Sequence, residues 1–206
     1  MKMASILCVL SIIISSCSSG EYQATSIPRE NPPALQKLNQ NDAWVIYRTI
    51  LTEVRQNSDL NGAGSKGLGA KDPLVYRLET IPAPDVSIIA DQSDVSIQLR
   101  SSFVQANQNP VILEKSYDVL DWTEAASVSP DINEFFFEMR RKNPNTKAVL
   151  NISSIGIAGL SAIAYVEYYS EVGGLRKAFL LLEVERSHRD ENKLVAASIV
   201  RTIAVE

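Results

Sequence analysis

The only histidine of the chain, His188, directly follows a serine and precedes an aspartate by two positions, and these are the side-chain types of a hydrolytic triad. Ser187, His188 and Asp190 lie within the run SHRDE. A serine hydrolase uses these groups as nucleophile, general base and orienting acid, but it usually recruits them from distant segments. Three residues so close in a polar run do not easily reach that geometry. We therefore expect His188 to lie in a solvated turn between two strands.

Carboxylates on neighbouring strands are a second set of groups able to perform acid–base chemistry. Glu167, Glu183 and Glu185 fall in segments with strand periodicity. General acid–base catalysis requires such groups to reach one substrate, which convergence of the strands would allow. The alternative is an exposed sheet face on which acidic residues alternate with apolar ones. The sequence leaves both interpretations open and identifies no catalytic residue.

Metal sites are not indicated by the number or spacing of possible ligands. Zinc prefers several His and Cys ligands, but the chain has one histidine, and we expect its two cysteines, Cys8 and Cys17, to leave no free thiol in the mature protein. Asp85, Asp91 and Asp94 lack the spacing of a calcium-binding loop. We therefore expect neither a metal ion nor a cofactor.

A glycine-rich stretch, NGAGSKGLGAKD, matches a dinucleotide-binding fingerprint as a string. Gly62, Gly64 and Gly67 have the GxGxxG spacing. In that motif a strand precedes the glycines and a helix follows, so that the helix N-terminus faces a pyrophosphate. Here a predicted helix precedes the glycines and Pro73 follows them. We interpret the stretch as a loop.

The first residues predict export from the cytoplasm. Lys2 precedes an apolar run at 4–14, and two serines then lead to Cys17. This is the charged, apolar and small-residue order of a secretory signal. The run is shorter than the roughly 20 residues that span a bilayer as a helix.

Residues 14–17, ISSC, resemble the lipobox of bacterial lipoproteins, although Ile14 replaces the usual leucine. In that family the cysteine thiol receives a diacylglycerol, the chain is cut before the cysteine, and the new amine is acylated, commonly with palmitate. The resemblance implies a signal peptide at 1–16 and a lipidated Cys17 that attaches the protein to a membrane of the cell envelope. In Gram-negative lipoproteins the absence of Asp after the cysteine favours the outer membrane, on its periplasmic side, and Ser18 occupies that position.

Composition limits the kinds of partner. The formal net charge is −4, whereas nucleic-acid binders concentrate Lys and Arg, so we expect no nucleic-acid partner. Residues 17–41 comprise the lipidated cysteine and a tether rich in Ser, Asn, Gln and Pro. About 24 flexible residues have a mean reach of roughly 27 Å. The remainder, 42–206, has the length of a single domain.

Two segments show helical periodicity. The first runs from Asp42 to about Gln56, with Asn41 or Asp42 as the N-cap. The second runs from Ser129, as N-cap, to Lys142. The apolar stripe of the second helix consists of Ile132, Phe135, Phe136 and Met139. Such a stripe is more typical of a core than of a groove for a partner. Residues 94–106 are ambiguous between helix and irregular structure.

From Lys147 onward the apolar period changes to two. It predicts four strands, at roughly 147–157, 161–172, 175–186 and 194–205, with a bulge in the first at Ser153-Ser154. Shorter strands are expected at 74–81 and 111–117. The predicted fold class is α+β: an N-terminal helix and a mid-chain helix packed on an antiparallel sheet that ends in a four-strand C-terminal meander.

The C-terminal part also resembles a diffuse group of uncharacterised bacterial envelope proteins, in which a helix and an Asn/Pro-rich turn precede three hairpin-linked strands. The matching residues are Asn143-Pro144-Asn145-Thr146, Ile155-Gly156-Ile157, Ala164-Tyr165-Val166, Gly173-Gly174 and Leu181-Leu182-Glu183. A tryptophan often precedes the last strand in that group, and Leu194 stands there instead. The resemblance implies a fold and no particular activity.

Three tyrosines of the second predicted meander strand are candidates for an interface. Tyr165, Tyr168 and Tyr169 place an aromatic ring on both faces of that strand. Tyrosine is enriched at protein interfaces, and it suits a half-buried sheet equally well. We expect a membrane-anchored, non-enzymatic module that binds an envelope protein or helps an assembly. The alternative is a small-ligand carrier or a hydrolase-type enzyme with a pocket in a cupped sheet.

Overall fold

The computed structural model describes residues 38–56, 74–113, 122–126, 129–190 and 193–205. Cys17, the glycine-rich stretch and residues 17–37 of the expected tether lie outside these residues, and the tether ends earlier than predicted because the first helix begins at Gln40. None of the helices in the described part of the chain is long and apolar enough to span a bilayer.

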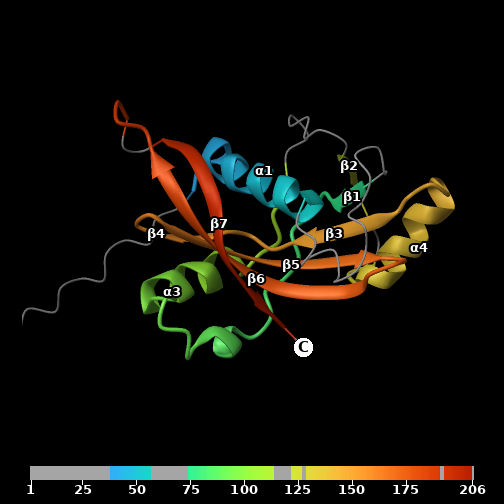
Figure 1. Ribbon diagram of the computed structural model, residues 1–206, viewed down its shortest axis with the longest axis horizontal. Helices are drawn as coiled ribbons and strands as arrows, with labels where there is room; N and C mark the ends of the chain where they lie inside the picture. Colours follow the sequence, from blue (N-terminus) through green and yellow to red (C-terminus); the bar gives the residue numbers. More distant parts are fainter. Residues whose placement is uncertain (1–37, 57–73, 114–121, 127–128, 191–192, 206) are drawn as a thin grey trace, which may run out of the picture. The chain divides into compact units, whose positions relative to one another are not determined.

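A mixed sheet with the strand order β2-β1-β3-β5-β6-β7 forms the centre of the fold, and β4 pairs with β5 beside it (Figure 1). The strands are β1 (Leu74–Arg77), β2 (Trp122–Ala125), β3 (Ala148–Ile152), β4 (Gly156–Ala158), β5 (Ser161–Ser170), β6 (Gly174–Arg186) and β7 (Leu194–Ala204). Each pair from β3 onward is antiparallel. The predicted α+β class with a C-terminal meander is confirmed.

The sheet is not wholly antiparallel, contrary to the prediction from the sequence, because the strand β1 has parallel neighbours. It runs parallel to both neighbours, with Leu74 opposite Trp122 of β2 and Ala148 of β3. Parallel neighbours require a crossover connection, and the chain between β1 and β3 contains the helical segments that make one. β1 is also shorter than predicted, because Glu79 and Ile81 form only isolated bridges, to Ile112 and Ser153.

In the described part of the chain, four helical segments accompany the sheet. They are α1 (Gln40–Gln56), the short 3₁₀ helix η1 (Val86–Ile89), α3 (Ile97–Ala106) and α4 (Ile132–Lys142). The segment at 94–106, left ambiguous by the sequence, is therefore mainly helical. Its N-cap is Ser96, whose side chain accepts a hydrogen bond from the backbone N–H of Leu99 at 3.1 Å.

The predicted N-caps of the two periodic helices are wrong by two or three residues. At α1 the cap is Asn39, whose Oδ1 accepts from the backbone N–H of Asp42 at 2.9 Å. At α4 it is Asp131, whose Oδ1 accepts from the backbone N–H groups of Asn133 at 2.8 Å and Glu134 at 2.9 Å. Several short polar residues precede each helix, and the chain path selects the one whose oxygen faces the free N–H groups.

The helices cover opposite faces of the sheet. Figure 1 shows α1 on one side and α3 on the other. The even-numbered core residues of β5 and β6 pack with α1, whereas the odd-numbered ones pack with α3. α4 covers Val75 and Val149 on the same face as α3. The predicted stripe of α4 is buried, which confirms it as core.

The strand predicted at 147–157 is divided into β3 and β4 at Ser153. Ile152 lies opposite Val166 and Gly156 lies opposite Ile163, so three residues of this strand face two of β5. The extra residue is the bulge that the shift in apolar alternation predicted. The hydroxyl of Ser153 accepts from the backbone N–H of Tyr165 at 2.8 Å and fixes the interruption.

Asp42 joins α1 to the last strand. Its buried carboxylate accepts from the backbone N–H of Leu194 at 2.9 Å and from the side-chain amide of Asn39 at 2.8 Å. We expect Asp42→Ala to lower the free energy of unfolding by about 1–2 kcal/mol, because the N–H of Leu194 would lose its acceptor while buried. Urea unfolding followed by tryptophan fluorescence measures the change.

The matched variants for this test are Asp42→Asn and Asp91→Ala. Asparagine retains an acceptor oxygen and is expected to lose less stability than alanine. Asp91 is exposed, so its replacement should change stability by less than about 0.5 kcal/mol. Equal stability of Asp42→Ala and Asp91→Ala would contradict the proposed role of Asp42.

Candidate functional site

A band of polar side chains crosses the sheet face that α3 and α4 share. Strand alternation places one such residue on each of four adjacent strands. They are Arg77 of β1, Asn151 of β3, Glu167 of β5 and Lys177 of β6. Together with the hydroxyl of Tyr165 we call them the polar seam.

The polar seam lies between two apolar clusters. On β5, Ile163 and Tyr165 belong to the cluster beside α3, and Tyr169 packs against the cluster beside α4, so Glu167 falls between them. The neighbouring strands repeat this arrangement, because Arg77 follows Val75 and Asn151 follows Val149 at the next position on the same face. The seam is therefore a polar interruption of an otherwise apolar face.

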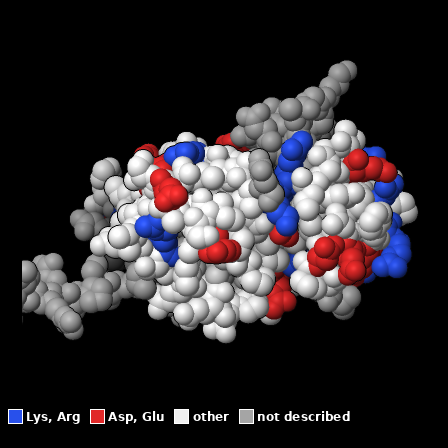
Figure 2. Space-filling view, turned by 90° about the horizontal axis from the view of Figure 1, so that it is seen from below, with Lys and Arg blue, Asp and Glu red and all other residues white. Residues whose placement is uncertain are grey.

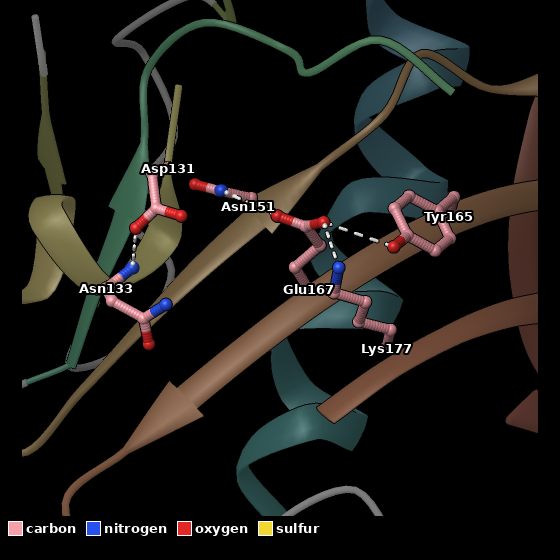
Figure 3. Close-up of polar contacts among 6 residues, drawn as sticks. All are labelled: Asp131, Asn133, Asn151, Tyr165, Glu167 and Lys177. Carbon is pink, nitrogen blue, oxygen red and sulfur yellow. Dashed lines mark hydrogen bonds and ion pairs between the residues drawn. The ribbon is translucent and has the colours of Figure 1, made fainter. Parts of the chain in front are cut away.

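Hydrogen bonds connect the members of the seam. Nε of Arg77 donates to Oδ1 of Asn151 at 2.8 Å, and Nδ2 of Asn151 donates to Oε2 of Glu167 at 3.2 Å. The other carboxylate oxygen, Oε1, accepts from the Tyr165 hydroxyl at 3.1 Å and lies 3.7 Å from Nζ of Lys177. Figure 3 shows the side chains of Tyr165 and Lys177 converging on Glu167.

The guanidinium of Arg77 is almost enclosed. The residue is 6% exposed, and its Cζ lies 4.7 Å from the centre of the Phe135 ring, within the range of a cation–π contact. Its Nη2 is buried and has no hydrogen-bond partner among the residues that the structure describes. Burial lowers the pKa of Arg77, and the negative charge of Glu167 opposes this effect. The guanidinium nonetheless stays protonated, as arginine does in proteins.

Tyr165 is held in its protonated form. Burial, and then the adjacent charge of Glu167, raises the pKa of the phenol above its usual value. The neutral hydroxyl therefore donates a hydrogen bond to the carboxylate and does not place a second negative charge beside it. Glu167 thus accepts hydrogen bonds from two side chains, Asn151 and Tyr165, and forms an ion pair with Lys177. This arrangement holds the carboxylate of Glu167 inside the sheet face, between the cations of Arg77 and Lys177.

The structure does not bring the three predicted strand carboxylates together. Glu167 lies opposite Lys177, whereas Glu183 lies opposite Ser161, six residues further along β6. At about 3.3 Å per residue the separation is roughly 20 Å. Glu183 and Glu185 are exposed, so the interpretation of converging carboxylates is wrong.

His188 is exposed in the turn between β6 and β7, which confirms its predicted position. The hydroxyl of Ser187 accepts a hydrogen bond from the backbone N–H of Arg189 at 3.2 Å, and the backbone N–H of Ser187 donates to the carbonyl of Lys193 at 2.9 Å. These local bonds are those of a hairpin turn.

The three candidate interface tyrosines belong to the packed interior. Tyr165 and Tyr168 are buried on opposite faces of the sheet. Tyr169 is half-buried, and its ring centre lies 4.9 Å from that of Phe136 on α4. Their burial removes the exposed tyrosine face that the predicted interface requires.

Two of the three aspartates considered as calcium ligands make contacts within the chain. Asp85 caps η1 by accepting from the backbone N–H of Ser87 at 2.9 Å, and Asp94 pairs with Arg201 at 2.7 Å. In the described part of the chain, no three His, Cys, Asp or Glu side chains are grouped so that they could hold a metal ion.

Two open hollows lie on the outer sides of the helices, away from the polar seam. One, of about 790 Å³, lies beside α4 and is lined by Ser129, Glu134, Phe137, Glu138, Arg140 and Arg141. The other, of about 600 Å³, lies beside η1 and α3, and Ile97 and Val104 are among its lining residues. Both residues are exposed apolar side chains.

Comparison with models of protein families, with curated protein sequences and with solved structures finds no match to this chain. The structure by itself defines an α+β protein with a polar seam on the sheet face that also carries α3 and α4.

The seam residues Arg77, Asn151 and Lys177 were missed by the sequence analysis. A signal for two of them exists, since Arg77 ends the run LVYR and Asn151 interrupts AVLNI at positions where alternation requires an inward side chain. A charged or amide residue at such a position indicates a buried polar contact.

Proposed function

We propose that this protein is a lipoprotein of the bacterial cell envelope whose α+β domain binds another envelope protein and catalyses no reaction. Acylated Cys17 would hold it to a membrane, which in a Gram-negative cell would be the outer membrane on its periplasmic side. The support for the anchor is the ISSC sequence at 14–17 and the signal that precedes it.

The hollow beside α4 is the observation that carries the binding proposal. Phe137 is 57% exposed in its lining, and its ring centre lies 5.8 Å from that of the buried Phe136. Charged side chains surround Phe137, which gives the hollow an apolar centre and a polar rim. Protein interfaces have this composition, and exposed aromatic and arginine residues often dominate their binding energy.

The charges around the hollow indicate the chemistry of the partner. Arg140 pairs with Glu171 and Lys142 pairs with Glu138, both at 2.7 Å. Arg141 is exposed and has no ion pair among the described residues. Figure 2 shows charged side chains of both signs at the end of the molecule that α4 occupies. We infer that the partner places an apolar side chain against Phe137 and an acidic one near Arg141.

Crosslinking in intact cells, followed by purification and mass spectrometry, tests this proposal. Phe137→Ala is expected to reduce capture of a defined partner by about tenfold or more, because a central aromatic contributes about 2 kcal/mol or more. Leu160→Ala is the matched control. Leu160 is 59% exposed and lies outside the hollow, so its replacement should leave capture unchanged.

The same preparation tests the anchor. Wild type should yield an N-terminal peptide that begins with acylated Cys17, and Cys17→Ser should leave the membrane fraction and lose the partner. An unmodified Cys17 within a longer chain would refute the anchor. Equal capture by wild type and Phe137→Ala would refute the binding surface.

A further inference from the structure

We propose that the edge of β7 pairs with β7 of a second copy of this chain, so that the last strands of the two copies join their sheets into one. The pairing uses neither the hollow beside α4 nor the polar seam, and it does not depend on lipidation of Cys17. It gives the domain a surface for self-association in addition to the surface proposed for a partner protein.

The strand β7 (Leu194–Ala204) forms one end of the sheet, so no other strand pairs with its outer side in the described part of the chain. Such an edge presents unpaired backbone N–H and C=O groups, and natural sheets usually protect it with short strands, lysines, prolines or bulges. β7 is 11 residues long, contains no proline and carries one charged residue, Arg201. Its edge is therefore open to pairing wherever a bulge or a helix does not protect it.

Bulges and α1 protect the first part of this edge. Val195 and Val200 have no partner on β6, because the register shifts at both positions. Between them, the hydroxyl of Thr49 on α1 donates to the backbone carbonyl of Ala197 at 3.3 Å. Figure 1 shows α1 beside the start of β7, whereas the end of the strand, near the mark C, lies away from this helix. The part of the edge without such protection is 201–205.

The direction of the backbone leaves two residues of this part with polar groups on the open side. The N–H of Val205 donates to the carbonyl of Lys177 on β6 at 2.8 Å, so Val205 faces β6. Successive residues at the edge of an antiparallel sheet direct their N–H and C=O groups alternately toward and away from the neighbouring strand. Thr202 and Ala204 therefore direct theirs outward, and no hydrogen bond from another described residue reaches these outward groups.

A second copy fits this edge because the segment is complementary to itself. Antiparallel pairing about a twofold axis at Ile203 would place Thr202 of each copy opposite Ala204 of the other and form about four backbone hydrogen bonds. Ile203 packs against the apolar cluster beside α3, and the two Ile203 side chains would meet on that face. Arg201 would lie opposite Val205, so no like charges would face each other. Thr202 and Ala204 are small and exposed, so they would not obstruct the approach of the second strand.

Disulfide trapping in the membranes of cells that express the full chain tests this pairing. In the proposed register, the Cα atoms at position 203 of the two copies would lie about 4.5 Å apart, which is within disulfide range. The contact is small, so we expect a reversible association, which a covalent trap detects. Under mild oxidation, Ile203→Cys should give a disulfide-linked pair of peptides with position 203 from both copies, measured by mass spectrometry.

Val172→Cys is the matched control for random collision. Val172 is 83% exposed and lies in the turn between β5 and β6, outside β7. We expect the link at position 203 to exceed the link at position 172 by about tenfold, because only position 203 would be held within disulfide range.

Further variants test the register and the hydrogen bonds. Co-expressed Thr202→Cys and Ala204→Cys should link to each other about fivefold more than either links to itself, because only the mixed pair would lie within about 5.5 Å. Thr202→Pro removes an N–H on the open side and leaves the hydrogen bonds to β6 intact, so it should reduce the link of Ile203→Cys about tenfold. Thr202→Lys should also reduce the link, because a charge on the edge opposes pairing of strands.

Three outcomes would overturn the proposal. They are a link at position 203 no stronger than at position 172, a link that persists unchanged in both Thr202 variants, and a position-203 peptide joined to a different protein instead of a second copy. If Ile203→Cys does not fold, the mixed pair at positions 202 and 204, which retains Ile203, decides the question. If Thr202→Pro does not fold, Thr202→Lys takes its place.

Discussion

Replacing Gly156 with alanine is expected to lower the free energy of unfolding by about 3 kcal/mol, the upper end of the usual cost of overpacking. A Cβ at this position would lie 2.5 Å from Cα and 2.6 Å from Cβ of Phe103, the centre of α3. The helix cannot easily retreat, because the hydroxyl of Ser102 accepts from the backbone N–H of Ile157 at 2.9 Å. A typical domain has only about 5–15 kcal/mol of stability, so this one methyl group would remove a large part of it.

Gly174→Ala is the matched control for this measurement. Gly174 has a positive φ of 68°, but an added Cβ there would meet no atom within 4 Å. Its replacement is expected to cost about 1 kcal/mol, from backbone strain alone. Comparing the urea unfolding of the two variants separates the free-energy cost of the contact with α3 from the cost of backbone strain at a positive φ. If Gly156→Ala cost no more than Gly174→Ala, the close packing of α3 on β4 would be contradicted.

Glu167→Gln is expected to lower the free energy of unfolding by about 2–3 kcal/mol. The substitution preserves the shape of the side chain but removes the negative charge that most strongly favours the protonated form of the enclosed Arg77. An uncompensated buried cation is strongly destabilising, and the partial exposure of Glu167 places the expected loss below the full cost of a broken buried pair.

A double-mutant cycle with Arg77→Met measures this coupling. Methionine has a similar length, removes the buried charge and can pack against Phe135, so Arg77→Met should cost less than Glu167→Gln. In the double variant the loss should fall below the sum of the two single losses by about 1–2 kcal/mol. Additive losses would show that the two side chains do not interact. Lys142→Gln, which breaks an exposed pair with Glu138, is the control and should cost less than about 1 kcal/mol.

The elements of this fold were largely predictable because their signals are local. The stripe of α4, the alternation of β5 and β6 and the turn that carries His188 depend on residues only a few positions apart. The bulge at Ser153 also appeared as a local shift in alternation. In the helices and strands, apolar residues recur with the period of the backbone, so that their side chains lie on one surface.

The caps and the direction of β1 were not predictable from the same information. Asn39 and Asp131, rather than their polar neighbours, face the free N–H groups, and this depends on the path of the chain into each helix. A short apolar strand has the same period whether its neighbours run parallel or antiparallel. Its direction depends on the crossover that connects β1 with β3.

The sequence by itself therefore determined the two periodic helices and the meander, because their signals come from residues close together in the chain. The prediction that Cys17 is lipidated still depends on the sequence alone. Only the tertiary structure decided that Tyr165 and Tyr168 are buried, that Glu183 and Glu185 lie far from Glu167, and that the polar seam exists. Arg77 and Glu167 are 90 positions apart, and strand order and register bring them to one face. Their interaction depends on distance in space, which the packing of β1, β3 and β5 fixes and which no short stretch of sequence encodes.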